Sequence, residues 1–298
     1  MSLSADLAVP DLAGTFADTM PGISPGVYDE RDFKAVAAII HKEAGIMLPP
    51  GKAMLVYSRL APLVRASGRG TFSGYIQLIE QDAGERRKTV NALTTNHTFF
   101  YREAHHFEHF AEVVRPRLLQ DLANGGSARM WSAGCSSGEE VFSLTMTLLG
   151  ADRSQGVQIA RRDIRILASD IADHALQKAS EGRYDAKDAS GLPDELRRNW
   201  TQNSGSQMVI AQEARSLVQF KRLNLQGEWP MRRPFQVIFC RNVMIYFDQP
   251  TKDRLVARFA QALAPGGYLY IGHSERVSGP AEDLLESVGP TIYHRRAR

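Results

Sequence analysis

Two glycines followed by two glutamates are the residues whose types and spacing best suit chemistry in this sequence. Gly134 and Gly138 lie in a short polar stretch after an apolar run, and a helical pattern begins at Glu139 and Glu140. Glycine lets a backbone approach a ligand closely, and the N–H groups at the start of a helix have no partner within it. Carboxylates in that first turn would repel a pyrophosphate, so the turn favours a neutral or cationic ligand with hydroxyls and an amine.

Asp170 adds a second acid to this arrangement. It ends the next apolar run, residues 164–169, where doubly wound sheets place a carboxylate that binds ribose hydroxyls. A ribose joined to a sulfonium amino acid meets both requirements, so we expect S-adenosylmethionine as the ligand. Ordinary packing of a strand against a helix is the alternative, because a GxxxG pattern alone is weak. A dehydrogenase is less favoured, since the turn lacks a full GxGxxG pattern.

Two further segments place polar groups beside aromatic or apolar ones. Residues 91–107, NALTTNHTFFYREAHHF, mix aromatic rings with Asn96, Thr98 and Arg102, as a pocket wall does. Rings that fill an interface between domains are the alternative. Residues 235–248, FQVIFCRNVMIYFD, form a buried strand with Arg241 at its carboxyl end, the edge where open parallel sheets bind ligands.

The alternation of apolar strands and amphipathic helices after residue 108 predicts a doubly wound α/β domain. We expect strands at residues 207–210 and 216–221 to form a small antiparallel insertion. We also expect a short turn around residues 203–207 to join the inserted strands there. The expected organisation is an acidic mobile tail (1–27), a helical domain (28–94), an interdomain linker that contributes to the site (95–107) and the α/β domain (108–298) with its insertion at about 200–221. Within the helical domain, apolar periodicity predicts helices near 28–45, after 51, at 71–79 and at 85–93.

Composition limits the class of protein. The chain has 298 residues, of which 43% are hydrophobic, enough for two domains with a substantial core. No apolar run approaches the roughly 20 residues that cross a bilayer, and no secretion signal is evident, so we expect a cytoplasmic protein without membrane insertion. Cys135 and Cys240 are too few for a disulfide framework, and His105, His106 and His109 have no acid or thiol partner in the pattern. We therefore expect no metal.

Charge is unevenly distributed along the chain. The net charge is +3, yet the first 30 residues contain five acids and no Lys or Arg. Residues 51–79 are the converse, with basic groups and no acid, and their candidate docking residues are Lys52, Arg59, Arg65 and Arg69. This face suits an acidic partner, either protein or nucleic acid, and an ordinary solvated helix surface is the alternative.

Taken together, five segments resemble the CheR-type chemoreceptor glutamate methyltransferases. They are TTNHTFFYRE, WSAGCSSGEE, ILASD, FCRNVMIYFD and LAPGGYLYIGHSE, and the resemblance spans residues 28–294. It implies an all-α N-terminal domain and a Rossmann-like S-adenosylmethionine-dependent methyltransferase domain with a small antiparallel β insertion.

The resemblance also implies roles for particular residues. The family's cofactor contacts fall on Asn96, Thr98, Arg102, Gly134, Glu140, Asp170, Asn224, Leu225, Cys240 and Arg241. Glu140 and Asp170 would hold ribose or amino groups, and Asn224 and Leu225 would border the adenine. Arg102 and Tyr246 would orient the substrate carboxylate. The family's receptor-docking helix corresponds to Lys52–Arg69.

The activity implied by the resemblance is protein-glutamate O-methylation in chemotaxis adaptation. Glutamates on the cytoplasmic helices of a chemoreceptor would become methyl esters, with S-adenosylhomocysteine as the other product. The short turn near residues 203–207 argues against a tether to a receptor's C-terminal pentapeptide. Departures such as Tyr101, Ser137 and Val141-Phe142 keep ring, hydroxyl or apolar character. A nucleic-acid methyltransferase, which we do not expect, and a non-catalytic nucleoside-binding regulator are the rival functions. The receptor, its modified glutamates, the role of the acidic tail and the oligomeric state are left open by the sequence.

Overall fold

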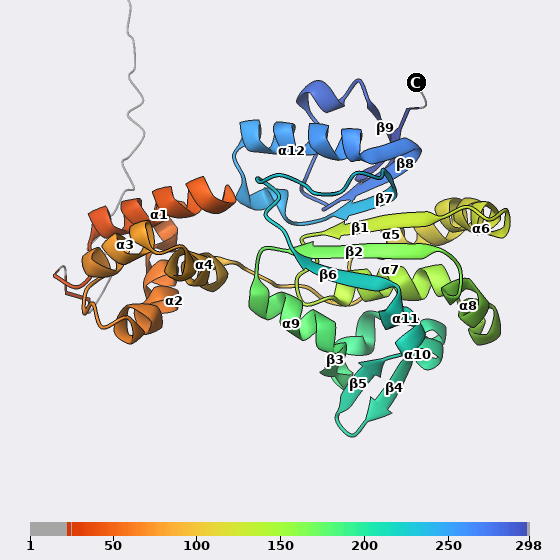
Figure 1. Ribbon diagram of the computed structural model, residues 1–298, viewed down its shortest axis with the longest axis horizontal. Coiled ribbons are helices and arrows are strands. Elements are labelled where there is room, and N and C mark those ends of the chain that lie inside the picture. Colours follow the sequence, from red (N-terminus) through yellow and green to blue (C-terminus); the bar gives the residue numbers. More distant parts are fainter. Residues whose placement is uncertain (1–22, 25, 297–298) are drawn as a thin grey trace, which may run out of the picture. The chain divides into compact units, whose positions relative to one another are not determined.

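The computed structural model describes residues 23–24 and 26–296 (Figure 1). Its described residues divide into two compact units, one within residues 23–42 and 47–93 and one within residues 43–46 and 94–296. The expected acidic tail, residues 1–27, lies largely outside the described residues.

Every regular element described in the smaller unit is a helix. Its helices are α1 (Glu30–Ala44), the 3-10 turn η2 (Pro50–Lys52), α2 (Ala53–Ala66), α3 (Phe72–Gln81) and α4 (Ala83–Leu93). Thr71 caps α3 by accepting a hydrogen bond from the Gly74 N–H, which satisfies one of the unpaired donors at the helix start. Val56 and Leu60, one turn apart on α2, are fully buried with Ile79 of α3. The four helices predicted from apolar periodicity are confirmed.

The larger unit is built on a seven-stranded sheet with the order β6-β2-β1-β7-β8-β10-β9. Its strands are β1 (Ala128–Ala133), β2 (Ile164–Asp170), β6 (Val218–Arg222), β7 (Phe235–Cys240), β8 (Leu263–Ile271), β9 (Leu285–Gly289) and β10 (Ile292–Arg295). The first five pair in parallel with one another, whereas β10 runs antiparallel to its neighbours β8 and β9. The predicted doubly wound α/β class is confirmed, with the carboxyl ends of β1, β2 and β7 at one edge.

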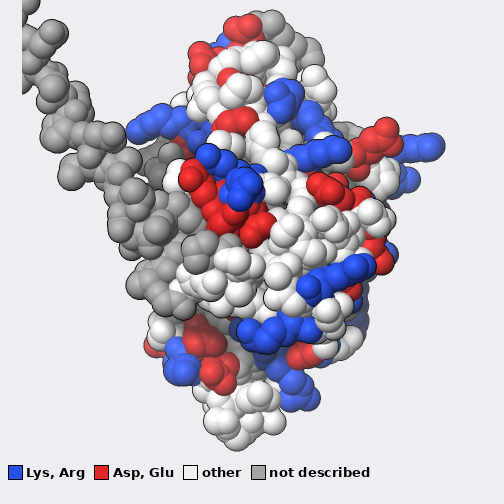
Figure 2. Space-filling model, turned by 90° about the vertical axis from the view of Figure 1, so that its left-hand side faces the viewer, with Lys and Arg blue, Asp and Glu red and all other residues white. Residues whose placement is uncertain are grey.

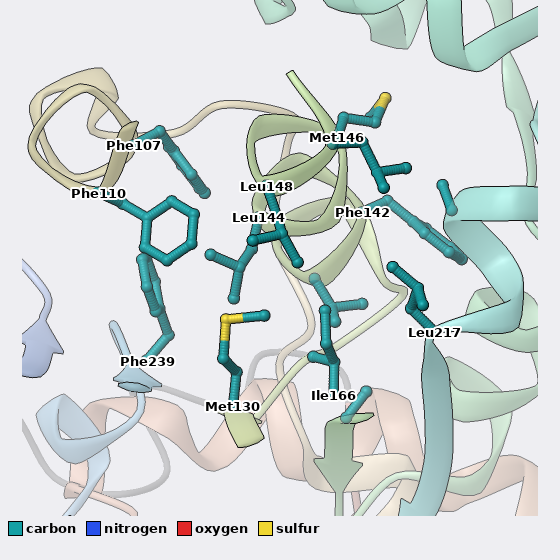
Figure 3. Packing of buried hydrophobic residues seen from close by; sticks show 14 of the residues in the cluster. Phe107, Phe110, Met130, Phe142, Leu144, Met146, Leu148, Ile166, Leu217 and Phe239 are labelled. Carbon is teal, nitrogen blue, oxygen red and sulfur yellow. The ribbon is translucent and has the colours of Figure 1, made fainter. Parts of the chain in front are cut away.

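Helices cover both faces of this sheet (Figure 1). They are α5 (Ala104–His109), the π-helical η3 (Phe110–Val114), α6 (Arg115–Ala123), α7 (Glu139–Leu149), α8 (Arg153–Ala160), α9 (Asp173–Glu181) and α12 (Gln249–Ala262). Successive residues of β1 serve the two faces, because side chains alternate along a strand. Met130 packs with Leu144 and Leu148 of α7, as Figure 3 shows, whereas Trp131 packs with Phe259 of α12.

A second, three-stranded sheet lies between β2 and β6 in the chain. Its strands are β3 (Arg183–Asp185), β4 (Thr201–Ser204) and β5 (Gln207–Ile210), in the antiparallel order β3-β5-β4. The 3-10 helix η4 (Ala186–Gly191) and the short helices α10 (Asp194–Trp200) and α11 (Gln212–Ser216) connect these strands to each other and to β6. Ser204 pairs with Gln207, so the β4–β5 connection is a two-residue turn, with Gly205 at a φ of +64°. The predicted short turn is confirmed.

One strand of the expected insertion was assigned wrongly. The segment predicted at residues 216–221 is β6, which pairs in parallel with β2 in the main sheet, with Val218 opposite Ile166. The small sheet instead takes its third strand from Arg183–Asp185, well before the expected start at about residue 200. Apolar alternation identifies a strand but does not say which sheet the strand joins.

The carboxyl-terminal part of the sheet also differs from expectation. The segment Pro265-Gly266-Gly267 lies within β8, where the pairing with β7 shifts register. Strand β9 was not expected, and the short 3-10 turns η5 (Met244–Tyr246) and η6 (Gly279–Ala281) complete the elements. In the part of the chain that the structure describes, no helix is both long and apolar enough to span a membrane.

Candidate active site

The glycine turn between β1 and α7 is tightly constrained by protein atoms. Gly134 and Gly138 have φ values of +83° and +98°, in the left-handed region that favours glycine. A Cβ at Gly134 would lie 2.3 Å from Val243 Cγ2, and one at Gly138 would lie 2.7 Å from Tyr184 Oη. The two glycines are therefore required by neighbouring loops and strands of the protein itself. The turn leaves the N-terminus of α7 without a side-chain cap.

Asp170, the last residue of β2, joins two loops at the carboxyl edge of the sheet. Its Oδ2 accepts a hydrogen bond from the Ser136 N–H at 2.8 Å, and its Oδ1 accepts one from the Ala172 N–H at 2.9 Å. Burial raises the pKa of Asp170, while these N–H groups act in the opposite direction. A carboxylate has about four lone-pair sites, and the N–H groups of Ser136, Ile171 and Ala172 leave at least one for a further donor.

The two glutamates of α7 have different surroundings. Both oxygens of Glu139 accept from the Ser137 hydroxyl, at 2.9 and 2.7 Å, inside the turn. Glu140 Oε1 accepts from the Ser132 hydroxyl at 2.7 Å, and its Oε2 lies 3.4 Å from Arg241 Nη1. Burial raises the pKa of Glu140, and the Arg241 charge opposes that rise. Glu139 also lies 3.7 Å from Lys178 Nζ, whereas Glu140 faces Arg241.

Arg241 follows β7 directly and is almost entirely buried. Its side chain is 2% exposed, lies over the Phe107 ring and donates to the Arg102 carbonyl oxygen. Its Nη2 is 3.3 Å from Glu103 Oε2, so the guanidinium lies between Glu103 and Glu140. Among the described residues its Nε has no hydrogen-bond partner. A buried donor of this kind is costly unless a ligand or water meets it.

Arg102 lies in a strained turn at the same edge. Its neighbours Tyr101 and Glu103 have φ values of 58° and 57°, which few non-glycine residues adopt. Arg102 Nη2 donates to Asn242 Oδ1 at 2.9 Å, and Nη1 donates to the His97 carbonyl at 3.3 Å. The side chain is 23% exposed, so its guanidinium is held from one side while part of it is accessible to solvent.

Four other predicted residues belong to the two segments that carry Arg102 and Arg241. The Asn96 carbonyl accepts from the Ser136 hydroxyl at 3.0 Å, which brings the 95–107 segment to the glycine turn, and Thr98 is half-buried in the same segment. Cys240 is fully buried at the end of β7, and burial raises the pKa of its thiol. Tyr246 is half-buried in η5 and packs against the core on the α12 side.

Asn224 and Leu225 follow β6 in a loop that starts beside Asp170, because the Leu223 N–H donates to the Asp170 carbonyl at 3.0 Å. The Asn224 side chain donates to the Glu43 carbonyl at 2.6 Å and accepts from the Gln226 N–H at 3.0 Å. Leu225 is buried. The structure therefore places both residues next to the β2 end of the site, and Asn224 already takes part in holding its loop.

The candidate docking residues belong to the smaller unit. Lys52, Arg65 and Arg69 are exposed, whereas Arg59 is half-buried and donates to the Leu93 carbonyl at 3.2 Å. Arg59 thus has a structural contact that its spacing in the sequence did not indicate. Figure 2, which views the left-hand side of Figure 1, shows Lys and Arg groups in several places among Asp and Glu groups.

Two acids of the site, Glu103 and Glu275, were not among the expected site residues. Glu103 contacts Arg241, Asn242 and His273, and the buried Glu275 accepts backbone N–H bonds from Asn242, Met244 and Gly272 at 3.2, 2.7 and 2.6 Å. Glu275 thereby fixes the loop after β7 to the loop after β8. Their positions directly after Arg102 and after β8 were the only local signals for them.

The three histidines near residue 105 have separate partners. His105 Nε2 lies 3.2 Å from the Pro290 carbonyl, His106 Nε2 lies 2.8 Å from Thr291 Oγ1, and His109 Nδ1 lies 2.9 Å from Tyr270 Oη. Across the described residues, no three or more His, Cys, Asp or Glu side chains are grouped so as to hold a metal ion.

Comparison with known proteins defines the class. Residues 96–293 match the CheR methyltransferase, SAM binding domain, and residues 31–94 match the CheR methyltransferase, all-alpha domain. The chain belongs to the CheR methyltransferase family.

Curated relatives support the same assignment over most of the chain. A probable chemotaxis protein methyltransferase of Rhizobium etli is 42% identical over 86% of this chain and 96% of its own. Chemotaxis protein methyltransferase 2 of Pseudomonas aeruginosa is 38% identical over 89% of this chain and 93% of its own. The chemotaxis protein methyltransferase of Escherichia coli is 38% identical over 89% and 90%. The protein is therefore an S-adenosylmethionine-dependent methyltransferase, which confirms the predicted fold and cofactor.

The residues present fit that cofactor. Glu140 and Asp170 offer carboxylate oxygens with free lone pairs to hydroxyl and amine donors, and the buried Arg241 Nε has a donor to spare. The α7 N-terminus, followed at once by two acids, suits a ligand that carries positive charge.

Proposed function

We propose that the protein methylates glutamate side chains on the cytoplasmic helices of chemoreceptors, forming glutamate methyl esters in chemotaxis adaptation. Two facts support this substrate. The relatives are named chemotaxis protein methyltransferases, and the site presents a partly exposed guanidinium, Arg102, at the carboxyl edge of the sheet.

The Arg102 guanidinium is the observation that carries the proposal. Asn242 and the His97 carbonyl hold its Nη2 and Nη1 from one side, at 2.9 and 3.3 Å. A guanidinium has five N–H donors in a planar fork that matches a carboxylate. With two contacts fixing its plane, Arg102 retains donors for an incoming carboxylate. We propose that Arg102 orients the acceptor and that Tyr246, in η5 beyond β7, assists from the adjacent loop.

The chemistry places few demands on the protein. The cofactor supplies a methyl group already activated on a sulfonium. A glutamate carboxylate is ionised at neutral pH, since its ordinary pKa is about 4.3, so no base is needed. The task of this chain is to bring the acceptor oxygen into line and to exclude competing groups. A fixed Arg102 performs that task by positioning.

We propose that the cofactor is held by residues at the β1, β2, β6 and β7 ends. Glu140 and Asp170 would accept from amine and ribose donors, and Asn224 and Leu225 would border the adenine. The other proposed contacts are Asn96, Thr98, Arg102, Gly134, Cys240 and Arg241. The support is their position: Asn96 contacts the glycine turn, and Leu223, just before Asn224, bonds to Asp170.

We also propose that the receptor docks on the basic residues of the smaller unit, Lys52, Arg59, Arg65 and Arg69. Receptor methylation regions that carry acidic side chains would be attracted to this charge. The two-residue turn between β4 and β5 offers little surface for a peptide, and we propose that docking does not use a C-terminal pentapeptide.

The test is incubation with methyl-labelled S-adenosylmethionine and receptor cytoplasmic fragments. A γ-glutamyl methyl ester releases the label as methanol in mild alkali, whereas an N-methyl group or a methylated nucleobase does not. We expect alkali-labile label on the native fragment and none on a matched fragment whose candidate glutamates are replaced by alanine. Stable label, or label on added nucleic acid, would overturn the proposed substrate.

A further inference from the structure

We infer that Glu103 is a positioning residue for the proposed acceptor site, acting through Arg102 and Arg241. The inference rests on the proposed function and adds a residue to it. The relevant group of side chains, here the Glu103 cluster, consists of Arg102, Glu103, His106, Arg241, Asn242 and His273.

Glu103 is the centre of this cluster. Its Oε2 lies 3.3 Å from Arg241 Nη2 and 3.6 Å from His106 Nδ1. Its Oε1 accepts from Asn242 Nδ2 at 3.1 Å and lies 3.2 Å from His273 Nδ1. The Glu103 side chain is only 12% exposed. A carboxylate surrounded in this way has its orientation fixed by groups from α5 and from the loops after β7 and β8.

The cluster is charged in a balanced way. Burial alone would raise the pKa of Glu103, but Arg241 and the hydrogen bonds from Asn242 and His273 outweigh burial and lower it to about 2. Burial and the Arg241 charge lower the pKa of His106 to about 3, so His106 is neutral at neutral pH. With His106 neutral, the charged groups of this region are the carboxylates of Glu103 and Glu140 and the guanidinium groups of Arg102 and Arg241.

Asn242 links Glu103 to Arg102 through two hydrogen bonds. Its Oδ1 accepts from Arg102 Nη2 at 2.9 Å while its Nδ2 donates to Glu103 Oε1. Glu103 itself stays 3.9 Å from Arg102 Nε, too far for a hydrogen bond. Arg102 is thus oriented through a neutral amide, and its charge is not consumed by a tight pair with Glu103. This leaves the guanidinium available to a carboxylate from outside.

The backbone reinforces this arrangement. Arg102 is flanked by two residues in the left-handed region, and the Arg102 carbonyl accepts from Arg241, the same group that pairs with Glu103. The Tyr101 N–H donates to the Ser143 hydroxyl at 2.9 Å, which fixes the start of the turn to α7. Strained turns persist where surrounding contacts over-determine them, and they concentrate at functional sites.

Removing the Glu103 charge should change catalysis more than binding. In Glu103→Gln the two guanidinium groups lose one of their two carboxylates, so an acceptor carboxylate would be held more tightly and in a less defined orientation. We expect kcat for the receptor fragment to fall at least about tenfold, with KM unchanged or lower and cofactor affinity by calorimetry within about threefold. Glu108→Gln, at an exposed position on α5, should match the wild type.

A charge-relocation variant sharpens the test. Asn242→Asp alone places a second carboxylate against Arg102 and should raise KM. In the double variant Glu103→Gln with Asn242→Asp the charge of the cluster is restored but the new carboxylate at position 242 still pairs with Arg102, so we expect its kcat to exceed that of Glu103→Gln while its KM stays raised. A loss of kcat in the double variant that equals that of Glu103→Gln, or that equals the sum of the losses in the two single variants, would contradict a role based on charge and orientation.

A readout independent of turnover separates this inference from the proposed function. The NMR signals of the Arg102 and Arg241 Nε–Hε groups can be assigned with Arg102→Lys and Arg241→Lys. In Glu103→Gln these signals should shift and sharpen, because both side chains gain freedom. Unchanged signals together with an unchanged kcat in Glu103→Gln would overturn the inference. It would also be overturned if Glu103→Gln lost folding and cofactor affinity in proportion to its loss of kcat. If the wild type yields no alkali-labile label, the proposed function fails and the arginine signals alone decide the role of Glu103.

Discussion

At the scale of single residues, backbone strain coincides with the candidate site. The described non-glycine residues with positive φ are Tyr101, Glu103, Ser136, Asn242 and Thr291. The first four carry or hold the groups discussed above, and Thr291 contacts His106. Each such conformation costs free energy that ordinary loops avoid. The site thus takes its geometry from contacts between distant parts of the chain, which a local pattern does not encode.

Arg102 provides a first test at this scale. Arg102→Ala should lower kcat/KM for the receptor fragment by about a hundredfold or more, since a lost bidentate contact and lost orientation act together. Cofactor affinity should change little, because Glu140 and Asp170 remain. Radiolabel transfer and calorimetry measure the two quantities. Arg102→Lys keeps the charge without the planar fork, and we expect it to recover only a small part of the activity. Equal losses of transfer and binding would make Arg102 mainly a cofactor ligand.

His106 gives a prediction for stability. The pKa of His106 is lowered by burial, then by Arg241, to about 3, so the unfolded state takes up a proton below about pH 6.5 while the folded state does not. This contribution to stability is present above pH 6.5 and is lost as the pH falls toward 3, by about 1.4 kcal/mol per pH unit.

Denaturant unfolding followed by tryptophan fluorescence measures this slope, because Trp131, Trp200 and Trp229 all belong to the larger unit. His106→Gln should flatten the slope between pH 6.5 and 4.5, even though it destabilises the protein overall. A slope that the substitution leaves unaltered would show that other groups dominate this range. The exposed His97→Gln is the matched control.

At the scale of elements, the small sheet is joined to the glycine turn. Tyr184 of β3 donates its hydroxyl hydrogen to the Ser137 carbonyl at 2.7 Å, and its ring packs edge-on against Phe100 at 4.9 Å. One buried side chain thus contacts both the turn before α7 and the segment that carries Arg102. The inserted sheet therefore supports the cofactor side of the site.

We expect Tyr184→Phe to lower the free energy of unfolding by about 1–2 kcal/mol, because the buried Ser137 carbonyl loses its donor. Cofactor affinity should fall several-fold as the glycine turn becomes less fixed. Tyr268→Phe, on β8, removes a hydroxyl that accepts from Arg117 of α6, and it should leave cofactor affinity unchanged. An equal effect of both substitutions on calorimetric affinity would count against a link between β3 and the turn.

The elements also show what sequence patterns can provide. Helices α1 to α4 and strands β1, β2 and β7 follow from apolar periodicity, since burial of one stripe or run fixes their type. The membership of β6 could not be read, because strand pairing depends on partners outside the local window. Glu103 was missed for a related reason: its contacts lie 139 and 170 residues away, at Asn242 and His273.

At the scale of the whole molecule, the two units separate docking charge from the proposed chemistry. Lys52, Arg65 and Arg69 belong to the smaller unit, whereas Glu140, Asp170 and Arg102 belong to the larger one. Substitutions of the docking residues in the smaller unit should therefore affect receptor binding and spare methyl transfer, whereas substitutions in the larger unit should affect methyl transfer and spare receptor binding.

Reversing two charges of the smaller unit tests that separation. Lys52→Glu with Arg65→Glu should raise KM for the receptor fragment about tenfold or more and weaken its salt dependence, since complementary charge mainly speeds encounter. The kcat at saturating receptor and the cofactor affinity should be retained. Arg161→Glu with Arg162→Glu reverses two exposed charges of the larger unit and is the matched control. An increase in KM in the Arg161/Arg162 control equal to that in the Lys52/Arg65 variant would refute docking on the helical unit.

The contact between Gly134 and Val243 has a consequence for protein engineering. Because the space beside Gly134 is filled by Val243, the loops after β1 and β7 interlock and cannot be varied independently. Chimeras that graft only one of these loops from a relative should fold poorly, whereas grafts that exchange both together should be tolerated. Libraries aimed at new acceptors would accordingly have to diversify the two loops as a matched pair.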